Sequence, residues 1–320
     1  MQNISYSNNH LKSILDNNKF GRYFEDTDLD INESMEHSIT LLSDLLEKEE
    51  ILTIENEKNK NSEGGLLIYK ISNWDSIHFE KKTVIIEQIL ISSNTHNERF
   101  RTASTLLSKF KVWCINNEIK FVMSKVSSID LPVINALEKI GFNFIESWIY
   151  NKYDLQKHIS NPENNLELRL AKSSDLDYML EFSLGAFSKH RFHADPNITL
   201  AKAESLYSKW IKTSFNDENQ NILVYDHNGI PSAFMTYYFN DLTHYFNKKY
   251  IMWRMAFLNP EIKGIGIGTQ FFQALFDYHK NEGYDIIDSG LSLRNTVSLN
   301  LHNKLSFKVT STLTNLHLWL

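Results

Sequence analysis

The sequence predicts a mixed α/β (α+β) fold made of two lobes in tandem, each with a mixed, mostly antiparallel sheet flanked by helices. Runs rich in β-branched residues alternate with amphipathic helical patterns along most of the chain. The same succession of elements occurs twice, and each succession ends in a helix, a short turn and a long strand. With 320 residues, 42% of them hydrophobic, the chain is long enough for two domains that each bury a core.

The first lobe is expected over residues 1–155. It begins with a polar segment, after which positions 33–49 have helical spacing. Further strands are expected over 65–71, 83–91, 120–126 and 143–153, and further helices over 101–116 and 131–139.

A polar stretch over 156–165 that contains Pro162 is the best candidate linker, so the second lobe is expected over 166–320. His227-Asn228-Gly229 has the composition of a hairpin turn between two antiparallel strands. The expected strands of this lobe cover 166–171, 221–225, 232–239, 250–258, 285–289 and 307–319, and the expected helices cover 174–187, 200–213, 269–282 and 296–304.

Composition narrows the class of function. The formal net charge of −6 argues against nucleic acid as a partner, because nucleic-acid-binding domains usually carry a basic face. No apolar run approaches the roughly 18 residues that span a bilayer, and residues 1–5 lack a basic region followed by an apolar one, so a cytoplasmic protein without a membrane partner is expected. The single Cys114 lies in an apolar run and is interpreted as a buried residue, and no metal site is expected.

The most informative segment is the glycine-rich run PEIKGIGIG over 260–268, which lies between a strand pattern and a helical pattern. Such a turn leaves backbone N–H groups unshielded at the positive end of a helix dipole, which suits a phosphate or pyrophosphate. A Walker loop is disfavoured because Thr269-Gln270 follows the last glycine where Lys and Ser or Thr are needed. A dinucleotide fold needs an acidic residue about 20 positions on, which Asp288 supplies, but the third glycine of its GxGxxG pattern would have to be Thr269 or Phe271. A tight strand-to-helix turn without a ligand is the structural alternative.

The apolar strand, Asn259-Pro260, the run KGIGIG and the helix that follows resemble the acyl-CoA-binding motif of the GNAT N-acetyltransferases, Arg/Gln-x-x-Gly-x-Gly/Ala. Lys263 takes the usual Arg or Gln position and keeps the positive charge without the planar fork. A second signature follows over 295–307, where NTVSLNLHNKLSF is similar to the family pattern Asn-x-x-Ala-x-x-Leu-Tyr-x-Lys-x-Gly-Phe. Ser306 departs from that pattern at the usual glycine.

The resemblance implies acetyl-CoA, or another acyl-CoA, as the co-substrate of the second lobe. The amides of 265–269 would hold its diphosphate, the backbone of 256–258 would meet the thioester carbonyl, and Asn295 would cap the last helix and contact pantetheine or water. The expected cofactor-binding residues are Phe257, Leu258, Lys263, Gly264, Ile265, Gly266, Ile267, Gly268, Thr269, Asn295 and His302.

The first lobe resembles the second in its final helix and strand, as LEKIGF over 137–142 and HNKLSF over 302–307 indicate. Its counterpart of the glycine turn, residues 94–101, contains no glycine, and Leu137 stands where the family has its acid. We therefore expect a degenerate first lobe that acts as a structural partner.

Residues 74–79 and 185–196, followed by Leu206, Tyr207, Trp210 and Ile211, resemble the dTDP-fucosamine N-acetyltransferase branch, in which a diminished lobe precedes the catalytic one. The resemblance implies the amine of a nucleotide-linked 4-amino-6-deoxy sugar as the acceptor. Cationic or titratable side chains over 189–193 suggest a pole that meets an anion, although a solvated loop anchored by Phe187 and Phe192 explains them as well. The candidate substrate-binding residues are Arg191, His193, Asp195 and Arg254.

The resemblance also implies direct attack of the amine on the thioester in a ternary complex. His302 takes the family's Tyr position and could protonate the leaving thiolate if a carboxylate raised its pKa above roughly 6.5; the alternative is that it has no chemical role. Asp288 is the candidate base, and the sequence leaves Ser289, Glu181, Asp195 and a water chain open for that role.

The function expected from these features is acetyl transfer from acetyl-CoA to a small-molecule amine, with a nucleotide-linked amino sugar as the best acceptor. Two alternatives stay open: acyl transfer to an amino acid, peptide or natural-product amine, and acyl-CoA binding without catalysis. A homodimer is kept open as the assembly.

Overall fold

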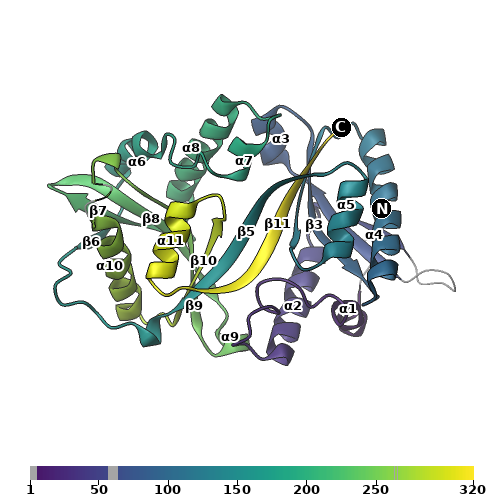
Figure 1. The fold of residues 1–320 in the computed structure, drawn as a ribbon, viewed down its shortest axis with the longest axis horizontal. Helices are drawn as coiled ribbons and strands as arrows, with labels where there is room; N and C mark the ends of the chain where they lie inside the picture. Colours follow the sequence, from purple (N-terminus) through teal and green to yellow (C-terminus); the bar gives the residue numbers. More distant parts are fainter. Residues whose placement is uncertain (1–5, 57–63, 263, 265) are drawn as a thin grey trace. The chain divides into compact units, whose positions relative to one another are not determined.

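The computed structural model describes residues 6–56, 64–262, 264 and 266–320 (Figure 1). Tertiary contacts divide the chain into unit 1, which comprises Met1–Trp148 and Thr310–Leu320, and unit 2, which comprises Ile149–Val309. The sequence expectation kept 166–320 together, whereas these contacts group the last eleven residues of that range with unit 1.

In unit 1 the strands lie in the order β1-β2-β3-β4-β11. β3 and β4 are parallel, and the other neighbouring pairs of this unit are antiparallel. The strands are β1 Ile51–Asn56, β2 Gly65–Ile71, β3 Thr83–Ile91, β4 Phe121–Ser127 and β11 Lys308–Trp319, and β5 Asn143–Asp154 crosses the boundary between the units. The helices are α1 Asn8–Leu15, α2 Ile31–Leu46, α3 Asn73–Phe79, α4 His96–Asn116 and α5 Leu131–Lys139.

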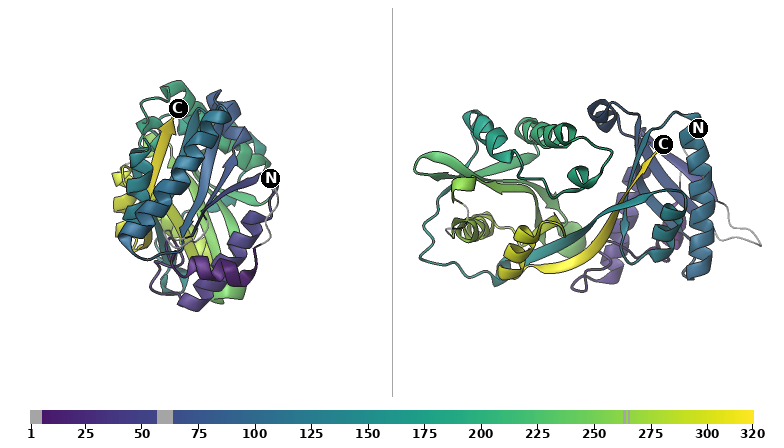
Figure 2. Two further views of the ribbon diagram at one scale, coloured as in Figure 1. Left: turned by 90° about the vertical axis from the view of Figure 1, so that its right-hand side faces the viewer. Right: turned by 45° about the horizontal axis from the view of Figure 1, so that its top comes forward.

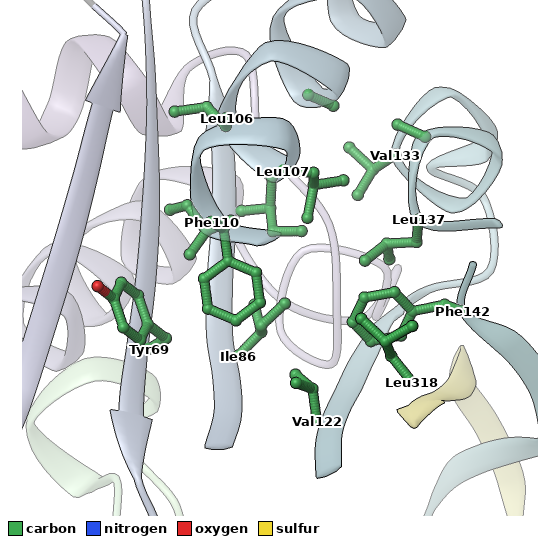
Figure 3. Packing of buried hydrophobic residues seen from close by; sticks show 14 of the residues in the cluster. Tyr69, Ile86, Leu106, Leu107, Phe110, Val122, Val133, Leu137, Phe142 and Leu318 are labelled. Carbon is green, nitrogen blue, oxygen red and sulfur yellow. The ribbon is translucent and has the colours of Figure 1, made fainter. Parts of the chain in front are cut away.

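The core of unit 1 lies between its strands and the helices α4 and α5 (Figure 3). Leu107 and Phe110 on α4 and Leu137 on α5 are fully buried there against β3 and β4. Cys114 belongs to the same core, and burial raises the pKa of its thiol to about 12, so the expected buried, unreactive cysteine is confirmed. α1 and α2 bury a second apolar cluster with Leu66, Ile68 and Leu90.

In unit 2 the strands lie in the order β10-β9-β8-β7-β6, with β9 and β10 parallel and the other pairs antiparallel. The strands are β6 Leu168–Leu170, β7 Gln220–His227, β8 Ile230–Asp241, β9 Lys249–Leu258 and β10 Ile286–Ser292. The helices are α6 Leu176–Ser183, α7 Arg191–Ala194, α8 Leu200–Asn216, α9 Thr243–Phe246, α10 Ile267–Asn281 and α11 Thr296–Lys304, with 3-10 turns η1 Leu155–Lys157, η2 Ser173–Asp175 and η3 Pro260–Ile262.

Helices cover both faces of the sheet in unit 2. α10 and α11 lie on one face, and α6 and α8 lie on the other (Figure 2). Trp253, Phe276 and Phe307 are part of the aromatic core beneath α10 and α11. In the described part of the chain, no helix is both long and apolar enough to span a bilayer.

The elements that end the two successions along the sequence match in length. β4 and β10 have 7 residues, α5 and α11 have 9, and β5 and β11 have 12. The parallel pairs also match, since residues 83–86 pair with 121–124 in unit 1 and 250–253 pair with 286–289 in unit 2. The prediction of two related lobes with mixed sheets is therefore confirmed.

Candidate active site

The two parallel strands of unit 2 separate at their carboxyl ends. Their pairing ends at Trp253 and Ser289, although β9 continues to Leu258 and β10 to Ser292, and every residue of both strands is described. β9 remains paired with β8 on its other side as far as Leu258. The edge of β9 that faces β10 therefore presents backbone N–H and C=O groups without a strand partner.

A β-bulge lies where the strands separate. Tyr237 pairs with Trp253 and Thr236 pairs with Met255, so Arg254 is the extra residue on β9. The Thr236 hydroxyl accepts a hydrogen bond from the Met255 N–H at 3.0 Å, which compensates for the interrupted ladder. The bulge leaves the Arg254 side chain exposed, with its guanidinium 5.7 Å from the Tyr238 ring centre.

The glycine turn joins β9 to α10. Gly266 is the N-cap of α10 with φ 91°, and Gly264 has φ 85°, a region that favours glycine. No side chain caps the helix, and helical geometry gives the N–H groups of Ile267 and Gly268 no intrahelical acceptor. The N–H of Thr269 was expected to bind the diphosphate, but it donates to the Gly266 carbonyl at 3.1 Å. Lys263 and Ile265, both expected to bind cofactor, lie outside the described residues.

The last two residues of β9 are Phe257, whose side chain is buried, and Leu258, and the backbone of both has no partner on β10. The Phe257 side chain is buried against the rings of Phe234 and Phe187. Leu258 lies against the start of α10, where a Cβ on Gly268 would be 3.6 Å from the Leu258 Cδ2. That is an ordinary contact distance, so this glycine position tolerates alanine sterically, as the family pattern Gly/Ala implies.

His302 is buried on α11, 5% exposed, between the rings of Phe272 and Phe307. Its Nδ1 lies 2.8 Å from the Ser298 carbonyl, and its Nε2 lies 3.2 Å from the Ser289 hydroxyl. Because a carbonyl can only accept, Nδ1 carries the proton, and Nε2 of the neutral ring accepts from Ser289.

Burial lowers the pKa of His302 to about 4, against a smaller opposing effect of the Ser298 carbonyl. The hypothesis of an imidazolium donor required a carboxylate that raises this pKa. Within the described part of the chain, the ring nitrogens contact a hydroxyl and a carbonyl instead. The condition for an imidazolium at neutral pH is therefore not met at His302, and desolvation is the reason.

Asn295 caps α11 as the sequence predicted. Its side-chain oxygen accepts a hydrogen bond from the Ser298 N–H at 3.2 Å. The same residue, Ser298, holds the His302 ring through its carbonyl. The cap therefore fixes the turn of helix that orients His302.

Asp288 faces the opposite side of the sheet from Ser289. Ser289 pairs with Trp253, which lies in the core under α10, so alternation directs Asp288 toward the face covered by α6 and α8. Its side chain is 3% exposed. Ser292, four residues further along the strand and on the same face, donates from its hydroxyl to the Lys189 carbonyl at 3.5 Å. The segment before α7 thus reaches the end of β10 on the face of Asp288.

The helix α7 and its C-cap contain three of the candidate acceptor-binding residues, Arg191, His193 and Asp195, and the charge of this region is reduced by pairing and burial. His193 Nε2 lies 2.9 Å from the Glu204 carboxylate on α8. Burial, with the nearby charges of Arg191 and His193, lowers the pKa of His190 to about 4. The Asp195 carboxylate accepts from the Asn197 N–H at 2.9 Å and is 2% exposed. The cationic pole is therefore reduced to Lys189 and Arg191, and Arg191 also covers the Phe192 ring.

Comparison with known proteins relates this geometry to a family. Residues 186–307, which include α7 to α11, match the acetyltransferase (GNAT) family. The chain contains a GNAT acetyltransferase domain. It is therefore an enzyme of the acyltransferase class, whose chemistry is acyl transfer to an amine, and members of this family generally use acetyl-CoA.

Relatives of this acetyltransferase have several substrates. The spore coat polysaccharide biosynthesis protein SpsD of Bacillus subtilis is 18% identical over 80% of this chain and 84% of its own length. The L-methionine sulfoximine/L-methionine sulfone acetyltransferase of Salmonella typhimurium is 26% identical over 28% of this chain and 52% of its own. Among solved structures, a tandem GNAT protein from the clavulanic acid biosynthesis pathway has a similar fold, with TM-score 0.53, 10% identity and coverage of 97% and 92%.

Sequence reasoning missed three residues that contact the candidate site: Thr236 at the bulge, Ser298 behind His302, and Glu204 beside His193. Only Ser298 had a local signal, because it lies four positions before His302 on a predicted helix. No cluster of residues suited to hold a metal ion occurs in the searched part of the chain that the structure describes.

Proposed function

We propose that unit 2 binds acetyl-CoA between the separated ends of β9 and β10 and transfers the acetyl group to the amine of a nucleotide-linked amino sugar. The assignment of acetyl-CoA as the acyl donor depends on one observation, that two features occur together at one end of β9. The strand edge offers unpaired backbone groups over 254–258, and the uncapped N-terminus of α10 follows directly. Pantetheine amides fit the first feature and a diphosphate fits the second.

In this proposal the diphosphate lies on the N–H groups of Ile267 and Gly268, with the positive end of the α10 dipole behind them. Pantetheine extends along the backbone of Leu258 and Phe257 toward the point where the strands meet. The thioester then lies above Trp253 and Ser289, the last paired residues. A backbone N–H of β9 stabilises the oxyanion that forms on the acetyl carbonyl.

The acceptor approaches from the face of Asp288. Asp288 takes one proton from the ammonium form of the amine, which then attacks the thioester carbonyl. The second nitrogen proton passes to the Ser289 oxygen as the Ser289 hydroxyl proton moves to His302 Nε2. Because burial makes this imidazolium a strong acid, the proton returns through the same hydroxyl to the departing thiolate. Two protons leave nitrogen, one ends on CoA sulfur, and the other reaches solvent from Asp288.

The amino-sugar acceptor is supported by two observations. The relative that spans most of this chain is named for polysaccharide biosynthesis. The segment before α7 meets the end of β10 at Lys189, and α7 begins with Arg191; the charges of these two side chains suit the diphosphate of a sugar nucleotide. His193, Asp195 and Arg254 complete the proposed acceptor side.

The test is release of CoA thiol from acetyl-CoA with two acceptors, a dTDP-4-amino-6-deoxy sugar and L-methionine sulfone. We expect turnover with the sugar nucleotide and kcat/KM at least 100-fold lower with the amino acid. The reverse order would assign an amino acid acceptor. That second candidate is favoured by the match to the methionine sulfone acetyltransferase, although this match covers only 28% of the chain. Absence of turnover with every amine would overturn both.

A further inference from the structure

Unit 1 contains the same separated pair of parallel strands, but its own chain lies between them. β3 and β4 pair over 83–86 and 121–124, and β3 then continues to Ile91. Ile91 ends β3 as Leu258 ends β9, eight residues after the first parallel pair in each unit. The segment of residues 17–25, between α1 and α2, lies against this end of β3.

Asn18 pairs with the backbone of Ile91 as a strand or an extended amide ligand would. Its Nδ2 donates to the Ile91 carbonyl at 2.9 Å, and its Oδ1 accepts from the Ile91 N–H at 3.0 Å. The side chain is 4% exposed. One carboxamide therefore satisfies both backbone groups at the position equivalent to the one proposed to meet pantetheine in unit 2.

Arg99, in the first turns of α4, binds the segment from the other side. Its Nη1 donates to the Asn17 carbonyl at 2.7 Å, and its Nη2 donates to the Asn18 Oδ1 at 3.1 Å. The same guanidinium makes a bidentate pair with Asp130, at 3.1 and 2.6 Å, and both side chains are buried. Asp130 is the N-cap residue of α5 as Asn295 is that of α11, but its carboxylate pairs with Arg99 and makes no capping hydrogen bond.

Glu25, the last residue of the segment, binds it to the end of β4. Its Oε1 accepts from the Ser127 hydroxyl at 2.6 Å and from the Gly21 N–H at 2.7 Å. Ser127 is the last residue of β4. The segment thus contacts the ends of both strands, β3 through Asn18 and β4 through Glu25.

Beneath the segment remains a cavity of about 210 Å³ that the ends of β3 and β4 also line. Ser124 lines it, and its buried hydroxyl has no hydrogen-bond partner among the described residues. Ser124 is the fourth residue of β4 as Ser289 is of β10, and Leu137 is the seventh of α5 as His302 is of α11. The serine is kept in unit 1, but the imidazole that would accept its proton is replaced by a leucine.

We infer that residues 17–25 are a built-in substitute for the cofactor in unit 1, which stabilises the separated strands and closes them to acyl-CoA. Acyl-CoA then binds at one site per chain, in unit 2. The stoichiometry rests on the proposed function, whereas the role of the segment does not.

The experiment measures amide hydrogen exchange at Ile91, thermal stability, and CoA stoichiometry by calorimetry in the full chain. Asn18→Ala removes both hydrogen bonds to Ile91. We expect the Ile91 N–H to exchange at least tenfold faster in this variant than in the parent, and the variant to have a lower melting temperature. Asn17→Ala is the matched control, since Asn17 contributes its backbone carbonyl, and exchange should stay within twofold of the parent. Asn18→Leu, which is close to Asn in shape and lacks both the donor and the acceptor, replaces Asn18→Ala if that variant does not fold, with the same direction of change expected.

Unchanged exchange at Ile91 in the Asn18 variant, or the same acceleration in the Asn17 control, would overturn the role of the segment. Two CoA molecules bound per parent chain would overturn closure of unit 1. If no CoA binds to the parent chain, the proposed function fails, and the exchange measurement still decides the role of residues 17–25.

Discussion

Replacing Gly266 by valine tests the proposed diphosphate site most directly. Gly266 has φ 91°, and a Cβ placed on it would meet no described atom within 4 Å. The added side chain therefore projects into open space beside the N-terminus of α10, where the diphosphate is proposed to lie. Strain at positive φ costs a non-glycine residue about 1–3 kcal/mol, which the fold tolerates more readily than the site does.

The expected loss of affinity follows from the two N–H donors of Ile267 and Gly268. Hydrogen bonds to a charged acceptor contribute about 1.5–3 kcal/mol each. Loss of both is worth about 3 kcal/mol or more, and since about 1.4 kcal/mol corresponds to a tenfold change, the Kd for CoA should rise about 100-fold.

Gly283→Val is the matched control, because Gly283 lies just beyond the other end of α10 with φ 80° and equally open surroundings. Both variants should lose similar stability in thermal unfolding, but only the Gly266 variant should lose CoA in calorimetry. Pantetheine, which lacks the diphosphate, should bind both variants as it binds the parent. A Kd for CoA in the Gly266 variant within threefold of the parent would refute the diphosphate site.

Three further predictions concern the histidines and the acceptor side. His302→Phe keeps a ring between Phe272 and Phe307 but removes the proton acceptor, so kcat should fall by about 10²-fold with the Kd for CoA within threefold; an unchanged kcat contradicts the role of His302. Burial lowers the folded-state pKa to about 4 for His302 and His190 and to about 3 for His279, below the ordinary value near 6.5. The neutral forms of these histidines therefore stabilise the fold fully above pH 6.5, and this stability is lost as the pH falls toward 4. For His302 the shift corresponds to about 3 kcal/mol, and denaturant unfolding at pH 7 and pH 5 of the parent and His302→Phe should show a smaller pH dependence in the variant; equal dependence would contradict it. Arg254→Ala should raise the acceptor KM about tenfold and change unfolding free energy by less than about 0.5 kcal/mol, because the side chain is exposed, and an unchanged KM would remove Arg254 from the acceptor site.

The repeated fold was predictable because it depends on local pattern. The parallel strands are rich in β-branched and other apolar residues, and the helices α5 and α10 have clear apolar faces, so their periodicity survives in the sequence. α7 and α9, with four residues each, were not predicted. A single turn fixes several dihedral angles for little hydrogen bonding, so its formation depends on tertiary packing such as that of Phe192 and Phe246.

The candidate site likewise contains some residues whose role depends on local sequence and others whose role depends on tertiary contacts. Gly266 and Asn295 act within a few residues of chain; the start of α11 at Thr296 is where the sequence predicted it, and α10 begins at Ile267, two residues before the predicted start at Thr269. The charge state of His302 depends on burial by Phe272 and Phe307, and that of the segment before α7 depends on Glu204, on another helix. Motif spacing contains no information about desolvation, which is why the sequence left open whether a carboxylate raises the pKa of His302, whereas burial lowers it.

The comparison of the two units separates what the fold supplies from what single residues supply. Separated strands, a serine at the last paired position and a helix after it are common to both, so these features follow from the repeated topology. Substituting His for Leu137 would restore a partner for Ser124, yet it would not create a second active site, because Asn18 still occupies both backbone groups of Ile91. The glycine turn is missing as well, and Arg99 is already bound to Asp130 at the helix start. In the proposed function, acyl-CoA binding therefore requires a strand edge and a helix end that the protein's own side chains leave open, and Gly264 and Gly266 add no side chain at the start of α10.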